Sequence, residues 1–165
     1  MKKIITLFNS LRKNTTFLQQ FKNIKCKNKY RKAKQQEQLI INYSNGLFSR
    51  LNNEYNSITF DSELDLKFGD MIDNNGNYYD LKVGEHYTGA INKRSIENFG
   101  NTTTNRHWYI CTNLTLSKIY IINARELYQL HLENKLIYRT GDDEYIGEKD
   151  YIKYPFTIKL EENSL

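Results

Sequence analysis

The sequence predicts an α+β fold, loosely α/β, in which a mixed central β-sheet is flanked by helices. Apolar residues recur at helical spacing in the first third of the chain, and the period changes to two from Ser57 onward. Strand-like and helix-like segments then alternate to the end. A chain of 165 residues, 39% of them hydrophobic, is long enough for one domain with its own core.

The helical part comes first. Residues 1–30 are weakly amphipathic, and a stronger helix is expected over residues 30–53. Its apolar stripe keeps an i, i+4 spacing through Leu39, Tyr43, Leu47 and Leu51. Gly46 lies inside this stretch and weakens a helix by about 1 kcal/mol relative to Ala, which we expect the packing of the stripe to offset.

Strands and two further helices are expected after Ser57. Strands are predicted over residues 58–60, 64–72, 77–83, 107–112 and 118–123, with an extended segment at 154–158. A short helix is predicted within 90–100. Another begins after Asn123, because Asn123 and Glu126 have the spacing of a capping box.

Charge is distributed unevenly. Residues 1–36 carry eleven Lys or Arg and no acid, whereas residues 37–165 carry thirteen basic and nineteen acidic residues. We therefore divide the chain into a basic N-terminal arm or helix, 1–36, and a folded domain, 37–165. The basic part is either an arm that contacts nucleic-acid phosphates, an organellar targeting segment, or a solvated basic helix.

A soluble, cytoplasmic (intracellular) protein without membrane contact is expected. No run approaches the roughly 18 consecutive apolar residues that suggest a membrane-spanning helix. Two cysteines, Cys26 and Cys111, fit neither a disulfide framework nor a zinc site. We expect Cys111, in an apolar strand, to be buried and inert.

The segment "GDMIDNNGNYYDLK", residues 69–82, predicts a β-hairpin with two possible registers. A two-residue loop at Asn75 and Gly76 would place Asp70 and Asp80 on opposite faces. A three-residue loop that ends with a left-handed Gly76 would set the two acids opposite each other, about 5 Å apart.

Facing carboxylates repel each other unless a cation lies between them. The ammonium of Lys82, on the same strand face as Asp80, would offset part of this repulsion, and a divalent cation would offset more of it. Ligation by oxygen alone favours Mg²⁺, with Mn²⁺ as the substitute. Such an ion would polarise a phosphoryl oxygen and activate a water. The alternative is a solvent-facing hairpin whose Asp–Lys pairs contribute little.

"GD", nine residues and then "DLK" resembles the signature of the PD-(D/E)xK nuclease superfamily, with Gly69 where a proline often stands. The resemblance extends through "RHWYICTNLTLSKIYIINARELYQL" to "KYPFTI" and is greatest to small type II restriction endonucleases. It implies a restriction-endonuclease-like core, with the first acid on the second strand and the triplet on the third.

The resemblance also implies roles. Asp70, Asp80 and Lys82 would be catalytic, with Asp70, Asp80 and the carbonyl of Leu81 as Mg²⁺ ligands and Lys82 positioning the water. The chain would be a Mg²⁺-dependent endonuclease acting on double-stranded DNA, a homodimeric type II restriction enzyme that cuts a short palindromic site. A junction-resolving or organellar nuclease, or a non-catalytic nucleic-acid-binding protein, remains an alternative.

Other residues are secondary candidates. Glu37 and Glu54 are candidate extra ligands from the first long helix, although a surface position is favoured for both. Contacts to DNA bases or phosphates are expected from residues after the triplet, where a solvated loop is the alternative: His86, Tyr87, Asn92, Lys93 and Arg94. We expect His107 to be a structural histidine.

Overall fold

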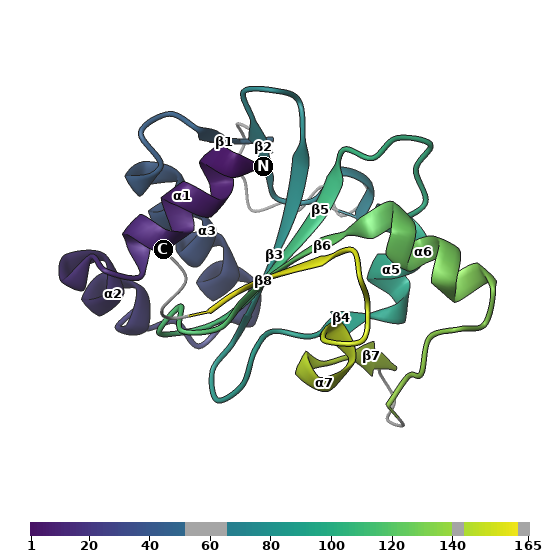
Figure 1. The fold of residues 1–165 in the computed structure, drawn as a ribbon. Helices are drawn as coiled ribbons and strands as arrows, with labels where there is room; N and C mark the ends of the chain where they lie inside the picture. The colour runs from purple at the N-terminus through teal and green to yellow at the C-terminus, as the bar shows by residue number, and fades with distance from the viewer. Residues whose placement is uncertain (52–65, 140–143, 162–165) are drawn as a thin grey trace.

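The computed structural model describes residues 1–51, 66–139 and 144–161. A six-stranded sheet crosses the centre of the molecule in the order β1-β2-β3-β5-β6-β8 (Figure 1). The strands are β1 (Phe48–Arg50), β2 (Met71–Asp73), β3 (Tyr78–Gly84), β5 (His107–Asn113), β6 (Ile119–Asn123) and β8 (Thr157–Leu160). β3 and β5 are parallel and the other neighbours antiparallel, so the predicted mixed sheet is confirmed.

Helices cover both faces of this sheet (Figure 1). One side carries α1 (Lys2–Leu11), α2 (Thr15–Lys22) and α3 (Lys29–Tyr43). The other side carries α5 (Lys93–Phe99), α6 (Ala124–Leu132) and α7 (Glu148–Tyr151), next to a small sheet of β4 (Ile91–Asn92) and β7 (Tyr145–Ile146). The predicted α+β class is therefore confirmed. None of the described helices is long and apolar enough to cross a membrane.

Alternation along the strands divides the core in two. Tyr79 and Leu81 of β3 belong to a cluster with the apolar residues of α1, α2 and α3. Tyr109 and Cys111 of β5 belong to a second cluster with α5, α6 and α7. The central strands are thus buried on both faces, which parallel pairing generally requires.

The first 36 residues are part of this fold rather than a separate arm. Ile4, Phe8, Phe17 and Phe21 are completely or almost completely buried in the first cluster. Burying a side chain of this size stabilises the fold by about 1.5–3 kcal/mol. The boundary drawn at residue 36 from charge falls inside α3 and does not coincide with the end of an element.

The long helix expected over 30–53 ends at Tyr43, earlier than predicted. Asn45 and Gly46 both have positive φ, 53° and 78°, which α-helical geometry does not allow. The chain turns there, and Phe48 enters the sheet in β1. The apolar stripe was expected to continue the helix past Gly46, and it does not. Leu47 and Phe48 instead pack into the same core from a turn and from a strand.

The hairpin adopts the three-residue loop. Met71 lies opposite Tyr79 and Ile72 opposite Tyr78. The Asp73 amide donates to the Asn77 carbonyl at 3.0 Å, and Gly76 has a φ of 79°. The strand expected over 64–72 is only three residues long here, and the one expected at 58–60 lies outside the described residues.

The later elements agree with expectation. β3, β5 and β6 cover the strands predicted over 77–83, 107–112 and 118–123. The side chain of Asn123 accepts a hydrogen bond from the Glu126 amide at 3.0 Å and so caps α6, as predicted. The short helix within 90–100 is α5, and the last extended segment is β8, which begins three residues later than predicted.

Candidate active site

A close approach between two segments places Asp70 beside β3. Gly69 has a φ of 75°, and a Cβ at this position would lie 2.7 Å from the carbonyl oxygen of Tyr79. The glycine therefore lets the chain pass directly against the strand. The Asp70 amide donates to the Tyr79 carbonyl at 2.8 Å, and Asp70 Oδ2 accepts from the Leu81 amide at 3.0 Å.

Asp80 and Lys82 lie on one face of β3, where Asp80 is buried and Lys82 is partly exposed. Lys82 Nζ lies 3.3 Å from Asp80 Oδ2, and Asp80 is 7% exposed. Ser95 of α5 covers the pair and donates its hydroxyl to Asp80 Oδ2 at 3.3 Å. The Ser95 hydroxyl also lies 2.9 Å from the Tyr109 hydroxyl. The solvent-facing hairpin considered from the sequence is therefore wrong, because α5 packs over it.

The two acids respond to this environment in opposite directions. Burial raises the pKa of Asp80 to about 7, and the nearby Asp70 carboxyl adds to the rise while Lys82 opposes it. Burial also acts to raise the pKa of Asp70, but the ammonium groups of Lys34 and Lys82 and hydrogen bonds from Asp80 and the Leu81 amide outweigh it, so that pKa is lowered. Paired acids pushed apart in this way are typical of functional sites.

Lys82 stays in its ammonium form at neutral pH. Burial lowers the pKa of Lys82, but the carboxylates of Asp80 and Asp70 outweigh burial and raise the pKa above its ordinary value. The side chain of Lys82 is also more exposed than that of Asp80. The group can therefore donate hydrogen bonds to a bound anion or a water, and it is poorly suited to act as a base.

α3 adds a third carboxylate, that of Glu37, which was expected on the surface from the sequence. Glu37 is only 2% exposed, so that expectation is wrong. Its carboxylate contacts Lys34 Nζ at 3.4 Å and Arg50 Nη1 at 3.5 Å. Burial and the neighbouring Asp70 raise the pKa of Glu37 well above its ordinary value. Glu54, the other candidate of this kind, lies outside the described residues.

The donor set suits a hard cation. Within the described residues, His, Cys, Asp and Glu side chains do not gather in threes around one point, so the pair Asp70 and Asp80 is the ligand group to consider. Mg²⁺ is commonly held by one or two carboxylates, with waters and substrate phosphates at the remaining positions. Asp80, whose pKa is raised by burial and by the neighbouring Asp70 carboxyl, together with the partly exposed Asp70 fits that requirement.

The five candidate DNA contacts do not form one group. His86 and Tyr87 are exposed on the loop after β3, and Arg94 is exposed on α5. Asn92 instead caps α5 by accepting from the Ser95 amide at 2.7 Å. Lys93 pairs with Glu144 at 3.4 Å. Two of the five thus have structural interactions of their own.

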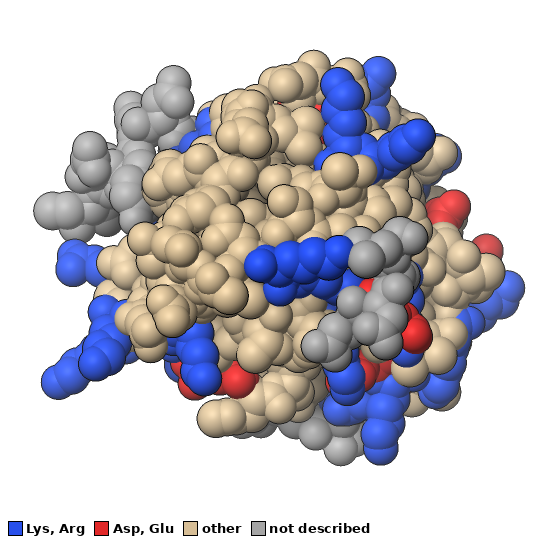
Figure 2. Space-filling model, turned by 60° about the vertical axis from the view of Figure 1, so that its left-hand side comes forward, with Lys and Arg blue, Asp and Glu red and all other residues tan. Residues whose placement is uncertain are grey.

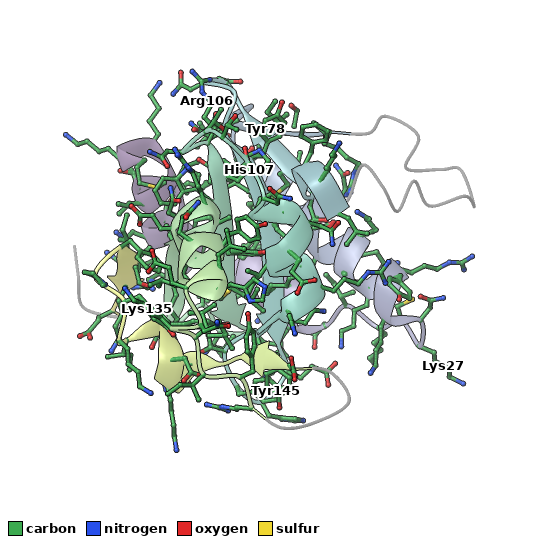
Figure 3. The ribbon with its side chains drawn as sticks, turned by 90° about the vertical axis from the view of Figure 1, so that its right-hand side faces the viewer. Lys27, Tyr78, Arg106, His107, Lys135 and Tyr145 are labelled. Carbon is green, nitrogen blue, oxygen red and sulfur yellow. The ribbon has the colours of Figure 1, made fainter. Side chains whose placement is uncertain are left out.

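A basic segment outside those five residues, but inside the basic residues 1–36, spans the end of α2, the connection and the start of α3. Its exposed cations are Lys22, Lys25, Lys27, Lys29 and Arg31. Lys32, next in line, forms an ion pair with Glu85 on the loop after β3. The segment therefore reaches the end of the strand that carries Asp80 and Lys82. Lys27 extends away from the body of the molecule (Figure 3), and basic side chains exceed acidic ones on this side (Figure 2).

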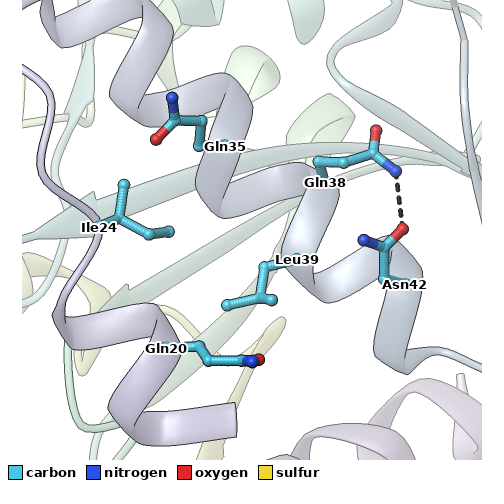
Figure 4. Close-up of a pocket in the computed structure, with 6 residues that line it drawn as sticks. All are labelled: Gln20, Ile24, Gln35, Gln38, Leu39 and Asn42. Atoms are coloured by element: carbon cyan, nitrogen blue, oxygen red, sulfur yellow. Dashed lines mark hydrogen bonds between the residues drawn. The ribbon is translucent and has the colours of Figure 1, made fainter.

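A pocket of about 240 Å³ lies between α2 and α3 (Figure 4). Its lining consists of amides and two aliphatic side chains: Gln20, Ile24, Gln35, Gln38, Leu39 and Asn42. Gln38 donates to Asn42 across its rim at 2.8 Å. With no titratable or nucleophilic side chain in its lining, this pocket offers no chemistry of its own.

Two further candidate side chains, His107 and Cys111, lie inside the fold. His107 is buried at the start of β5, next to Tyr78 (Figure 3), and its Nδ1 lies 2.9 Å from the Phe99 carbonyl. Cys111 is completely buried, and burial raises the pKa of its thiol to about 12. The structural position of His107 and the burial of Cys111 are confirmed.

Comparison with known proteins gives no match. No protein-family model matches the chain, and no curated protein or solved structure is similar enough to indicate a relationship. The chain's own residues and their geometry are therefore the basis for inferring its function.

Proposed function

We propose that the chain is a Mg²⁺-dependent DNA endonuclease of the PD-(D/E)xK type. The observation that carries the proposal is the close grouping of Asp70, just before β2, with the buried Asp80 and the partly exposed Lys82 of β3. Two acids from separate segments lie together with opposite pKa shifts, and one ammonium is beside them. A hairpin stabilised only for folding would gain nothing from such a buried charge cluster.

Asp70 and Asp80, with the Leu81 carbonyl, are the groups we propose to hold the ion. When bound, Mg²⁺ supplies charge neutralisation at a phosphoryl oxygen and a more acidic water. The chain's own contribution is to keep both carboxylates in place. Leu81 fixes Asp70 through its amide, and Ser95 fixes Asp80 through its hydroxyl.

Lys82 provides the positive charge nearest the proposed reaction. Its ammonium would hydrogen-bond the attacking water or the scissile phosphate and stabilise negative charge as it develops. Because Lys82 remains protonated, the proton released by the water must leave to solvent or to the phosphate rather than to this side chain.

The proposed substrate is double-stranded DNA. Supporting this choice, the basic segment between α2 and α3 runs to the edge of the site and can follow a phosphate backbone. We further propose restriction-type action as a homodimer at a short palindrome, since one site cuts one strand and a two-fold dimer presents two.

Cleavage of plasmid and phage DNA in Mg²⁺ and in EDTA tests this proposal. The comparison uses the natural protein, Asp80→Asn and Lys82→Ala, with Lys118→Ala as the matched control. Lys118 also pairs with a carboxylate, Glu148 at 2.7 Å, but on a different part of the surface. Discrete Mg²⁺-dependent fragments that disappear only in the two site variants are the expected result.

Two other outcomes would change the conclusion. Preference for four-way junctions over duplex would assign the chain to junction resolution instead of restriction. Salt-sensitive DNA binding without cleavage in Mg²⁺ or Mn²⁺ would contradict catalysis and leave a binding protein.

A further inference from the structure

One ammonium group is shared by two carboxylates at the edge of the proposed metal site. Lys34 Nζ, on α3, lies 3.4 Å from Glu37 Oε1 and 3.5 Å from Asp70 Oδ1. The second carboxylate oxygen of Asp70, Oδ2, already accepts a hydrogen bond from the Leu81 amide. Lys34 therefore contacts the oxygen of Asp70 that remains for a cation.

Three cationic side chains contact the acids of this cluster. Lys34 contacts Glu37 and Asp70, Arg50 contacts Glu37, and Lys82 contacts Asp80. A divalent cation held by Asp70 and Asp80 would lie close to the ammonium groups of Lys34 and Lys82, and like charges at such short range repel each other strongly. Because Lys34 contacts a proposed ligand oxygen directly, its ammonium and the ion compete for the same atom.

Lys34 can leave Asp70 without leaving its other partner unpaired. Its ammonium ends a flexible four-carbon stem. Glu37 keeps its contact with Arg50 at 3.5 Å after Lys34 leaves.

We propose that Lys34 is a displaceable internal cation that competes with the divalent ion for Asp70 and thereby sets the metal affinity of the site. This inference rests on the metal site of the proposed function. It predicts that the natural protein binds metal more weakly than its carboxylates alone would allow, and that removal of the Lys34 charge tightens binding.

Calorimetric titration of the full chain with Mn²⁺, without DNA, tests the inference. Lys34→Met and Lys34→Gln remove the charge, Lys34→Arg keeps it, and Lys118→Met removes a paired lysine elsewhere. We expect the Kd for Mn²⁺ to fall about tenfold or more in the Met and Gln variants, and to stay near the natural value in the Arg and Lys118 variants. Thermal melts establish that each variant is folded.

The outcomes separate this inference from the proposed function. An unchanged or weaker Kd in both Lys34→Met and Lys34→Gln, with binding still abolished by Asp80→Asn, would overturn the competition and leave the metal site in place. Absence of Mn²⁺ binding in every protein, including the Lys34 variants, would overturn both. Tight binding only when the Lys34 charge is removed would support the competition in its strongest form.

Discussion

Asp73 and Asp80 lie on the same hairpin and are buried to the same extent, each 7% exposed, yet their environments differ. Asp73 accepts hydrogen bonds from the amides of Asn75 and Asn77, at 2.8 and 3.0 Å, and from the Tyr79 hydroxyl at 2.8 Å. Asp80 has one hydroxyl donor, Ser95, and the ammonium of Lys82.

The pKa shifts follow from this difference. Burial acts to raise the pKa of Asp73, but hydrogen bonds from Asn77, Tyr79 and Asn75 outweigh it and lower the pKa. Burial raises the pKa of Asp80 to about 7. Equal solvent exposure thus goes with opposite pKa shifts. Asp80 lies deeper in the protein and next to the Asp70 carboxyl, whereas Asp73 has more fixed hydrogen-bond donors.

Loss of activity should be the largest effect that separates the two acids. Asp80→Asn should lower Mg²⁺-dependent DNA cleavage by at least about 10²–10³-fold, because it weakens a proposed ligand and the partner of Lys82. Asp73→Asn should retain most of the activity of the natural protein when both are fully folded. Initial cleavage rates at 25 °C measure this, and equal losses in the two variants would remove the distinction.

The free energy of unfolding should separate the two acids in the reverse order, with the larger loss at Asp73. Asp73→Ala leaves the buried Tyr79 hydroxyl and the amides of Asn75 and Asn77, which are only partly buried, without their acceptor. A buried unsatisfied group costs about 1–3 kcal/mol. Asp80→Ala removes a carboxylate that burial disfavours, and the Lys82 ammonium that it leaves is partly exposed and still has Asp70 nearby, so its cost should be smaller than that of Asp73→Ala. Urea unfolding in EDTA gives both values. A larger loss in Asp80→Ala than in Asp73→Ala would show that Asp80 is mainly structural.

The close approach at Gly69 can be tested against Gly46, since both have positive φ, 75° and 78°. Alanine in this conformation costs about 1–2 kcal/mol at either position. At Gly46 nothing lies within 4 Å of an added Cβ, whereas at Gly69 the Tyr79 carbonyl is 2.7 Å away. Gly69→Ala should therefore destabilise the protein more than Gly46→Ala, as measured by urea unfolding. Equal values would mean that the contact at Gly69 relaxes freely.

The sequence predicted the hairpin register as one of two alternatives, because Gly76 allows the left-handed bulge but does not require it. It predicted β5, β6 and the Asn123 cap because their patterns are local. It did not predict the end of α3 at Tyr43 or the burial of Glu37. Both depend on the pairing of β1 with β2 and on Arg50, which lies far from Asp70 in the sequence. The role of Ser95 was equally hidden, because no local pattern shows that α5 covers β3.

The smallest expected effect is the pH dependence of the contribution of Asp73. Its folded pKa lies below its unfolded pKa of about 3.9, so its stabilisation is present above that pH and is lost as pH falls through the folded value. The difference in unfolding free energy between the natural protein and Asp73→Asn should stay constant from pH 7 to 5 and narrow as the pH falls below about 4. A difference that is unchanged at pH 3 would contradict the hydrogen-bonded carboxylate.

The central claim is that Asp70 and Asp80, rather than Asp73, form the cation site. Anomalous diffraction from a crystal equilibrated with Mn²⁺ tests it most directly. The account predicts an anomalous peak in contact with the carboxylates of Asp70 and Asp80, with Lys34 turned away from Asp70. A peak at Asp73, or its absence at Asp70 and Asp80 under saturating Mn²⁺, would contradict the account.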